Sequence, residues 1–127
     1  MLIGVPEEIK NNEFRVGMTP ESVAEAVYHG HEVMVETRAG LGIDATDDHF
    51  RQAGAKIVKT AEEVFVKADM VVKVKEPQAG ERKMLREDQL LFTYLHLAPD
   101  PEQTKDLVKS GAICIAYETV TDTHGGL

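Results

Sequence analysis

The sequence predicts an α/β domain, with a mostly parallel sheet and helices on both of its faces. Two observations lead to this prediction. Short apolar runs alternate with helical patterns along the chain, and the segments between them are long enough to hold a helix. Strand–helix–strand units of this kind join parallel neighbours in one sheet. The length of 127 residues favours a single domain with a small core.

Six apolar runs are the predicted strands. Each is too short for a typical helix, and such runs favour buried strands when helical segments lie between them. The runs are LIGV (2–5), EVMVE (32–36), KIV (56–58), MVVKV (70–74), QLLFTYL (89–95) and AICIAY (112–117).

Start and stop signals place two helices in the first half of the chain. Thr19 is suited to the N-cap of the first helix, Pro20 to its first turn and Gly30 to its end. A shorter helix is expected over residues 46–53, before Gly54.

Two further helices are expected in the second half. One follows Thr60, and Glu63 three residues later completes the pattern of a capping box. The other is DPEQTKDLVKSG (100–111), in which the first Asp is the N-cap, Gln103 closes a capping box and the final Gly ends the helix. The polar stretch 76–89 is expected to be a loop with one helical turn.

The composition excludes several kinds of partner. Lys and Arg total 14 against 22 Asp and Glu, giving a net charge of −8, which disfavours nucleic acid and anionic membranes. Cys114 is the one cysteine, so an internal disulfide and a cysteine metal cage are excluded, and no metal site is predicted. The start of the chain lacks a signal peptide's basic region, and no apolar stretch is long enough to cross a bilayer. We therefore expect a protein of the reducing cytoplasm.

Polar side chains stand where the predicted strands end. In an open parallel sheet, ligands bind beyond the carboxyl ends of the strands. The residues at those ends are Arg15 in the loop after the first run, Lys73 and Lys75 on one face at the end of the fourth, Tyr94 and His96 at the end of the fifth, and Tyr117 and Glu118 at the end of the sixth.

Each of these residues has an ordinary structural explanation when taken alone. Arg15 would be a solvated loop cation, Lys75 an edge charge that blocks strand addition, and His96 a core histidine bonded to a carbonyl. Together, two cations beside a histidine in an acidic protein suit a small carboxylate substrate. Arginine binds a carboxylate through two parallel hydrogen bonds, and histidine exchanges protons near neutral pH.

A short glycine pattern resembles a dinucleotide-binding turn. Residues 40–45, GLGIDA, follow a predicted strand and fit G-x-G-x-x-A. However, Asp44, Asp47 and Asp48 crowd the start of the next helix, where a pyrophosphate would have to bind, and their charges would repel it. We therefore interpret this segment as an ordinary turn and predict no cofactor-binding residue in the chain.

Three long segments carry a resemblance to a known family. They are IGVPEEIKNNEFRVGMTPESVAEAVYHGHEV (3–33), ADMVVKVKEP (68–77) and LLFTYLHLAPDPEQTKDLVKSGAICIAYETV (90–120). Together they closely resemble the N-terminal part of bacterial alanine dehydrogenases. The alpha subunits of proton-translocating nicotinamide nucleotide transhydrogenases resemble the chain next, but that family lacks a catalytic histidine at the position of His96.

The resemblance implies a Rossmann-like, flavodoxin-like substrate domain and a reversible reaction, in which L-alanine, NAD and water give pyruvate, ammonia and NADH. It implies that Arg15 and Lys75 bind the carboxylate and carbonyl end of the substrate. His96 would be the general acid and base, with Tyr94 and Glu118 as neighbours of the pocket.

The chain departs from the resembled family in length. Family members are much longer, bind NAD through a second domain with its own glycine-rich loop, and then return to complete the first domain. We therefore expect residues 1–127 to be a partial N-terminal substrate domain, inactive alone. The family implies hexamers, and we expect the fragment to form a dimer or a larger homo-oligomer. Two alternatives are a non-catalytic module that binds a small oxo acid or amino acid, and a transhydrogenase alpha subunit.

Overall fold

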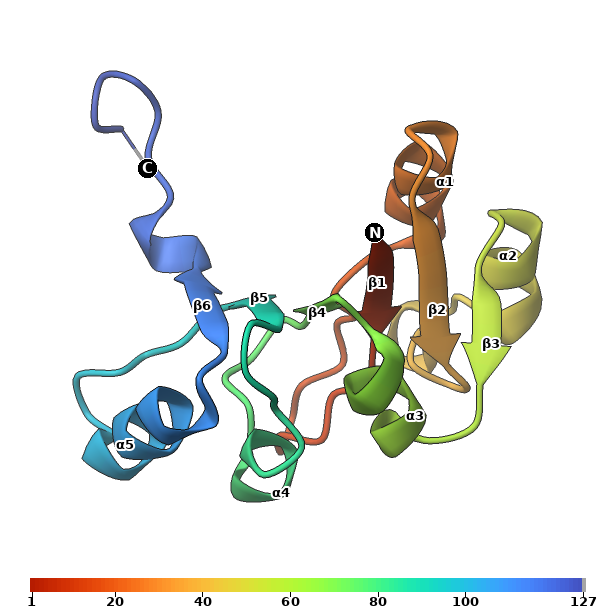
Figure 1. The fold of residues 1–127 in the computed structure, drawn as a ribbon. Coiled ribbons are helices and arrows are strands. Elements are labelled where there is room, and N and C mark those ends of the chain that lie inside the picture. The colour runs from red at the N-terminus through yellow and green to blue at the C-terminus, as the bar shows by residue number, and fades with distance from the viewer. Residues whose placement is uncertain (127) are drawn as a thin grey trace.

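The computed structural model describes residues 1–126 and confirms the predicted fold class. Six strands form one sheet in the order β3-β2-β1-β4-β5-β6, and every neighbouring pair is parallel (Figure 1). The strands are β1 (Leu2–Val5), β2 (Glu32–Glu36), β3 (Lys56–Val58), β4 (Met70–Val72), β5 (Leu90–Thr93) and β6 (Ile113–Ala116).

Helices occupy the connections between the strands. They are α1 (Pro20–Tyr28), α2 (Asp47–Gln52), α3 (Ala61–Lys67), α4 (Ala79–Arg82) and α5 (Pro101–Ser110), with single 3₁₀ turns η1 (Leu41–Ile43) and η2 (Tyr117–Thr119). The single turn of α4 lies in the polar stretch where one helical turn was expected. No helix within residues 1–126 has both the length and the apolar character needed to cross a membrane.

The core is divided between the two faces of the sheet. On one face, Val23 of α1 and Phe50 of α2 pack in a cluster with inward residues of β1 and β2. On the other face, Phe65 of α3 and Leu107 of α5 pack in a cluster with Leu91 of β5. Helices therefore cover both faces, as the sequence predicts for a parallel sheet.

The helical cover is uneven between the two ends of the sheet. Alternation along β6 directs Cys114 towards the α5 side, whereas Ile113 and Ile115 point to the opposite face. Ile113 is 50% exposed and Ile115 is 40% exposed. Figure 1 shows α1 and α2 over the β2 and β3 end of the sheet, away from β6. Within the described residues, one face of β6 is thus open to solvent.

The helix starts follow the predicted caps, but the two predicted capping boxes are wrong. Glu63 accepts a hydrogen bond from the backbone N–H of Lys59, not from that of Thr60. Gln103 turns inward and its side-chain amide donates to the carbonyl of Leu95. In both cases the N-cap side chain still accepts the expected N–H, so only the reciprocal bond differs.

Three predicted strands are too long at their ends. Strand β4 ends at Val72 rather than residue 74, because β1 has already ended and the N–H groups of Val74 and Lys75 bond to the Glu8 carboxylate. Strands β5 and β6 end at Thr93 and Ala116, short of the predicted residues 95 and 117. These shortened ends are where the candidate site lies.

Candidate functional site

The candidate site lies at the carboxyl edge of the sheet, beside the point where the strand order reverses. Strand β1 is followed in the chain by β2 on one side, whereas β4 is followed by β5 on the other side. Open α/β sheets bind ligands at such a switch point. The loops after β1, β4, β5 and β6 all leave from this edge because the strands are parallel.

Arg15 lies in the loop after β1 and is exposed. Its Nε and Nη2 atoms donate to the two carboxylate oxygens of Glu13 at 2.8 and 2.7 Å. This pairing lowers the pKa of Glu13 to about 2 and raises the pKa of Arg15. The loop rests on the end of β4, since a Cβ atom at Gly17 would lie 2.4 Å from the carbonyl oxygen of Val72.

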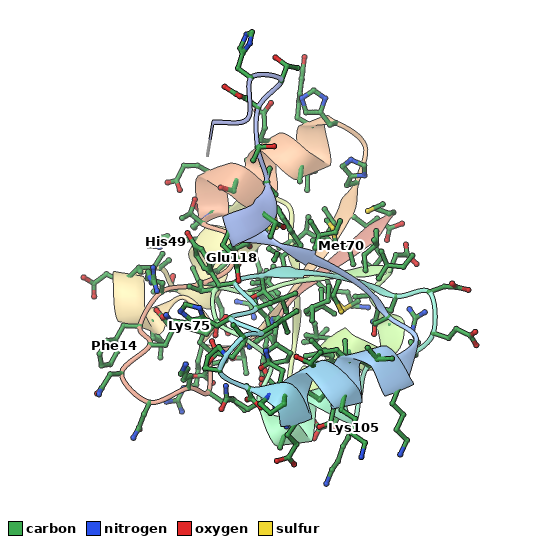
Figure 2. All side chains as sticks on the ribbon, turned by 90° about the vertical axis from the view of Figure 1, so that its left-hand side faces the viewer. Phe14, His49, Met70, Lys75, Lys105 and Glu118 are labelled. Carbon is green, nitrogen blue, oxygen red and sulfur yellow. The ribbon has the colours of Figure 1, made fainter. Side chains whose placement is uncertain are left out.

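Lys75 follows β4 and is half-buried. Its backbone N–H donates to the Glu8 carboxylate at 3.3 Å, and its ammonium makes no ion pair within residues 1–126. The positive charge of Lys75 helps to lower the pKa of Glu13, which also holds Arg15. Both predicted substrate-binding cations therefore act electrostatically on one carboxylate. Figure 2 shows Lys75 on the same side of the molecule as Phe14 and Glu118.

Lys73 is buried, unlike the half-buried Lys75, although the sequence placed both on one face. Its side chain is 1% exposed, and its ammonium lies 2.7 Å from Glu81 and 3.4 Å from Glu8. Burial raises the pKa of Glu8, and the positive charge of Lys73 opposes that effect. We call these three residues the Lys73 cluster. It joins the loop after β1, the end of β4 and helix α4.

His96 follows β5 at an exposed position and has a left-handed backbone, with φ of 50°. Its N–H donates to Glu118 at 2.8 Å, and the N–H of Leu95 donates to the same carboxylate at 3.1 Å. Desolvation raises the pKa of Glu118, but the N–H donors of His96 and Leu95 outweigh it, so the pKa lies below its ordinary value. Glu118 is therefore an anion at neutral pH.

Aromatic rings connect the ends of β5 and β6. Tyr117 packs edge-to-face against Phe92 at 4.4 Å and against Tyr94 at 4.9 Å between ring centroids. The Tyr117 hydroxyl donates to the carbonyl of Lys73 at 2.8 Å. Burial, followed by the negative charge of Glu8, raises the pKa of Tyr117 to about 12, so its hydroxyl stays protonated. Tyr94 remains 42% exposed beside this pair.

A cavity of about 310 Å³ opens beside Arg15. Glu8, Phe14 and Arg38 also line it, so it combines acidic and basic groups with an aromatic ring. A larger cavity of about 480 Å³ lies between the start of α1 and α2, and none of the predicted site residues lines it. The Arg15 cavity is therefore the better candidate for a small polar ligand.

The glycine pattern at residues 40–45 forms a tight turn that includes η1. A Cβ atom at Gly42 would lie 2.1 Å from the carbonyl oxygen of Phe14, and one at Gly40 would lie 2.5 Å from that of Ala45. Close packing of the chain against itself thus accounts for both glycines. Within residues 1–126, no group of three His, Cys, Asp or Glu residues is arranged to hold a metal ion.

The structure places the five predicted site residues at one edge of the sheet and adds three residues that the sequence did not assign to the site. The Glu8 carboxylate accepts from the N–H of Lys75, and the Glu13 carboxylate accepts from Arg15. The side-chain amide of Gln103 donates to the carbonyl of Leu95. A lysine inside the apolar run MVVKV was the available signal for a buried partner, because a buried charge needs an opposite charge.

Known proteins are similar to this chain in both sequence and fold. The family described as "Alanine dehydrogenase/PNT, N-terminal domain" matches residues 4–127. An alanine dehydrogenase of Methanococcus maripaludis is 55% identical over 94% of this chain and 32% of its own length. One of Mycobacterium tuberculosis is 50% identical over the whole chain and 34% of its own length.

Two solved structures are also similar. An L-alanine dehydrogenase has a TM-score of 0.95 and 50% identity, covering 99% of this chain and 35% of its own. A transhydrogenase from Sinorhizobium meliloti has a TM-score of 0.90 and 26% identity, covering 98% of this chain and 35% of its own. The chain spans about a third of the length of these relatives. It belongs to the alanine dehydrogenase/PNT N-terminal domain family.

Proposed function

We propose that residues 1–127 are the N-terminal substrate domain of an alanine dehydrogenase, which catalyses the reversible NAD-dependent oxidative deamination of L-alanine to pyruvate and ammonia. The observation that carries the proposal is the placement of Arg15, Lys75 and His96 at the carboxyl edge beside the switch point. About 50% identity to alanine dehydrogenases across the whole chain supports it.

Arg15 and Lys75 have separate tasks in this proposal. The guanidinium of Arg15 offers two parallel donors to the substrate carboxylate, and Glu13 occupies those donors in the free chain. The ammonium of Lys75 is a compact charge that suits the carbonyl end of the substrate. Because each cation is on a different loop, the substrate is fixed at two points.

His96 is the proposed proton carrier. A protonated imidazole donates to the carbonyl oxygen of pyruvate as ammonia adds to the carbon. In the other direction, a neutral imidazole takes a proton from the water that attacks the imine carbon. The exposed position of His96 at the edge supports this role. Tyr94 and Glu118 are proposed as neighbours of the pocket.

NAD is proposed to bind to a second domain that this chain does not supply. The residues present do not fit a dinucleotide, because Gly40 and Gly42 are packed against other backbone atoms and Asp47 and Asp48 follow them. When bound, the nicotinamide supplies the hydride acceptor or donor. Calorimetric titration of residues 1–127 with NADH should give no saturable micromolar binding; such binding would contradict this assignment.

The proposed setting is the cytoplasm, with self-association of the domain. Ile113 and Ile115 on the open face of β6 favour contact with a second copy. Light scattering on a dilute sample of residues 1–127 should give a dimer or a larger assembly. A monomer would contradict the self-association.

Two other functions are less supported. A transhydrogenase alpha subunit is disfavoured because identity to the transhydrogenase structure is 26%, against 50% to the alanine dehydrogenase structure. A non-catalytic module for small oxo acids would use the same Arg15 and Lys75. Only a catalytic measurement separates that module from a dehydrogenase.

The test is a chimera, in which residues 1–127 replace the matching third of the Methanococcus maripaludis alanine dehydrogenase. We expect alanine-dependent NADH formation. Lys75→Ala should weaken pyruvate binding, and Lys75→Arg should not restore it, because a planar fork does not replace a compact charge. A folded chimera without turnover, or one in which Lys75→Ala leaves pyruvate kinetics unchanged, would contradict the proposal.

A further inference from the structure

We propose that Glu118 and Gln103 are positioning residues that clamp the peptide group between Leu95 and His96 and so fix the imidazole for proton transfer. This inference rests on the proposed function of His96. The two side chains come from different segments: Glu118 from η2 after β6, and Gln103 from the first turn of α5. They approach opposite ends of one peptide group.

Glu118 holds the N–H end of that peptide group. Its Oε1 atom accepts from the N–H of His96 at 2.8 Å and from the N–H of Leu95 at 3.1 Å. Its Oε2 atom lies 3.3 Å from the same Leu95 nitrogen. The carboxylate thus accepts hydrogen bonds from two backbone N–H groups. Hydrogen bonds to an ionised acceptor are stronger than neutral ones, which suits a group that must stay fixed.

Gln103 holds the carbonyl end. Its side chain is fully buried, and its Nε2 donates to the carbonyl oxygen of Leu95. Its Oε1 is also buried and has no hydrogen-bond partner within residues 1–126. The bond to Leu95 is therefore the interaction that orients this amide. A side chain that only filled space or capped α5 would not need to direct its N–H donor at the carbonyl of Leu95, just after β5.

The unusual backbone conformation of His96 explains why the peptide group before it needs to be held. The φ of 50° lies in the left-handed region, which only a few per cent of non-glycine residues adopt, His more often than most. Such a conformation persists only where its surroundings hold it, and such residues cluster at functional sites. With both ends of the preceding peptide bonded, the N–Cα bond of His96 is held in place, and the φ of 50° about that bond directs the Cβ atom.

The clamp is separate from the residues proposed to bind the substrate. Arg15 and Lys75 lie after β1 and β4, whereas the clamp joins segments after β5 and β6. Loss of the clamp should therefore lower kcat and leave KM for L-alanine nearly unchanged. Misplacement of a catalytic group by about 1 Å reduces turnover by about 100-fold.

The experiment uses the chimera described above, with Glu118→Gln and Gln103→Met. Each variant keeps the size of its side chain: Glu118→Gln removes the negative charge from the acceptor, and Gln103→Met removes the donor to Leu95. We expect kcat to fall about 10- to 100-fold, with KM for L-alanine within about twofold. In residues 1–127, NMR should show faster amide exchange at His96 in Glu118→Gln, while the dispersion of the other amides stays native.

The chain offers a matched control for each variant. Gln89 is equally buried, and its amide donates to the carbonyls of Phe65 and Ala68 at the opposite edge of the sheet. Gln89→Met should lower stability without lowering kcat. Glu102→Gln removes an exposed charge from the first turn of α5 and should change neither quantity.

The outcomes separate this inference from the proposed function. If His96→Ala in the chimera keeps its turnover, the proposed function is wrong. If His96→Ala is inactive but Gln103→Met loses no more kcat than Gln89→Met, and Glu118→Gln no more than Glu102→Gln, the clamp is wrong. A loss that appears in KM with unchanged kcat would also overturn the clamp.

Discussion

The two halves of the candidate site are held by different kinds of interaction. The Lys75 half rests on the Lys73 cluster, in which three charged side chains are each at most 3% exposed. The His96 half rests on hydrogen bonds between side chains and the backbone, an exposed one at Glu118 and a buried one at Gln103. One half therefore depends on buried charge and the other on local peptide geometry.

This difference predicts how each half fails. Removal of one partner from a buried ion cluster leaves other charges without compensation, which destabilises the whole fold. Removal of one hydrogen bond near the surface costs little stability but lets the local backbone move. We therefore expect mutations around Lys75 to act mainly through folding, and mutations around His96 to act mainly through catalysis.

The largest effect is expected for Lys73→Met in residues 1–127. This change leaves Glu8 and Glu81 together in the core, and the free energy of unfolding should fall by about 3–5 kcal/mol. Urea unfolding measures it. Lys10→Met is the control, because Lys10 pairs with Glu76 at a partly exposed position and should cost at most about 1 kcal/mol. Equal losses for the two variants would show that the buried cluster contributes no more than a surface pair.

A smaller effect on stability is expected for Glu118→Gln. The change removes the negative charge from the side chain that accepts hydrogen bonds from Leu95 and His96. The free energy of unfolding should fall by about 1 kcal/mol. Urea unfolding in the same buffer provides the comparison with Lys73→Met. A loss as large as that of Lys73→Met would remove the distinction between the two halves.

The smallest expected effects are the opposite pH dependences of the two halves. Burial raises the pKa of Glu8 above its ordinary value of 4.5, so its contribution to stability is present at low pH and is lost as pH rises through its folded pKa. The pKa of Glu118 is lowered, so its contribution is present above about 4.5 and is lost as pH falls through its folded pKa.

Carboxyl carbon NMR titration of residues 1–127 checks these signs. Glu8 should titrate above 4.5, Glu118 below 4.5, and Glu13, which is paired with Arg15, near 2. Glu8→Gln and Glu118→Gln assign the two resonances. A Glu8 midpoint below that of Glu118 would contradict the contrast between the two halves.

The sequence predicted which residues lie at the edge of the sheet better than it predicted the residues that hold them in place. Parallel strands with polar ends bring Arg15, Lys75 and His96 to one edge, and that follows from local patterns. The partners of Lys73 do not follow, because Glu8 lies 65 positions earlier in the chain and periodicity carries no such pairing. Alternation along the run 70–74 gave Lys73 and Lys75 the same face without showing that only one is buried.

Gln103 also shows that a local sequence pattern does not reveal a hydrogen-bond partner outside the helix. Its position three residues after Asp100 fits a capping box, and that local pattern led to the wrong partner. In the folded chain the buried carbonyl of Leu95 needs a donor, and this tertiary requirement prevails over the local one. The η2 turn that carries Glu118 likewise begins at Tyr117, which was predicted to be the last residue of a strand.

Turnover of the chimera with His96→Ala tests most directly whether His96 carries the proton. His96 is exposed and its imidazole supports no part of the core, so the free energy of unfolding should stay within about 1 kcal/mol of the parent. Loss of a general acid and base should reduce kcat for alanine oxidation by about 100- to 10,000-fold. Turnover within a few-fold of the parent would show that His96 does not carry the proton.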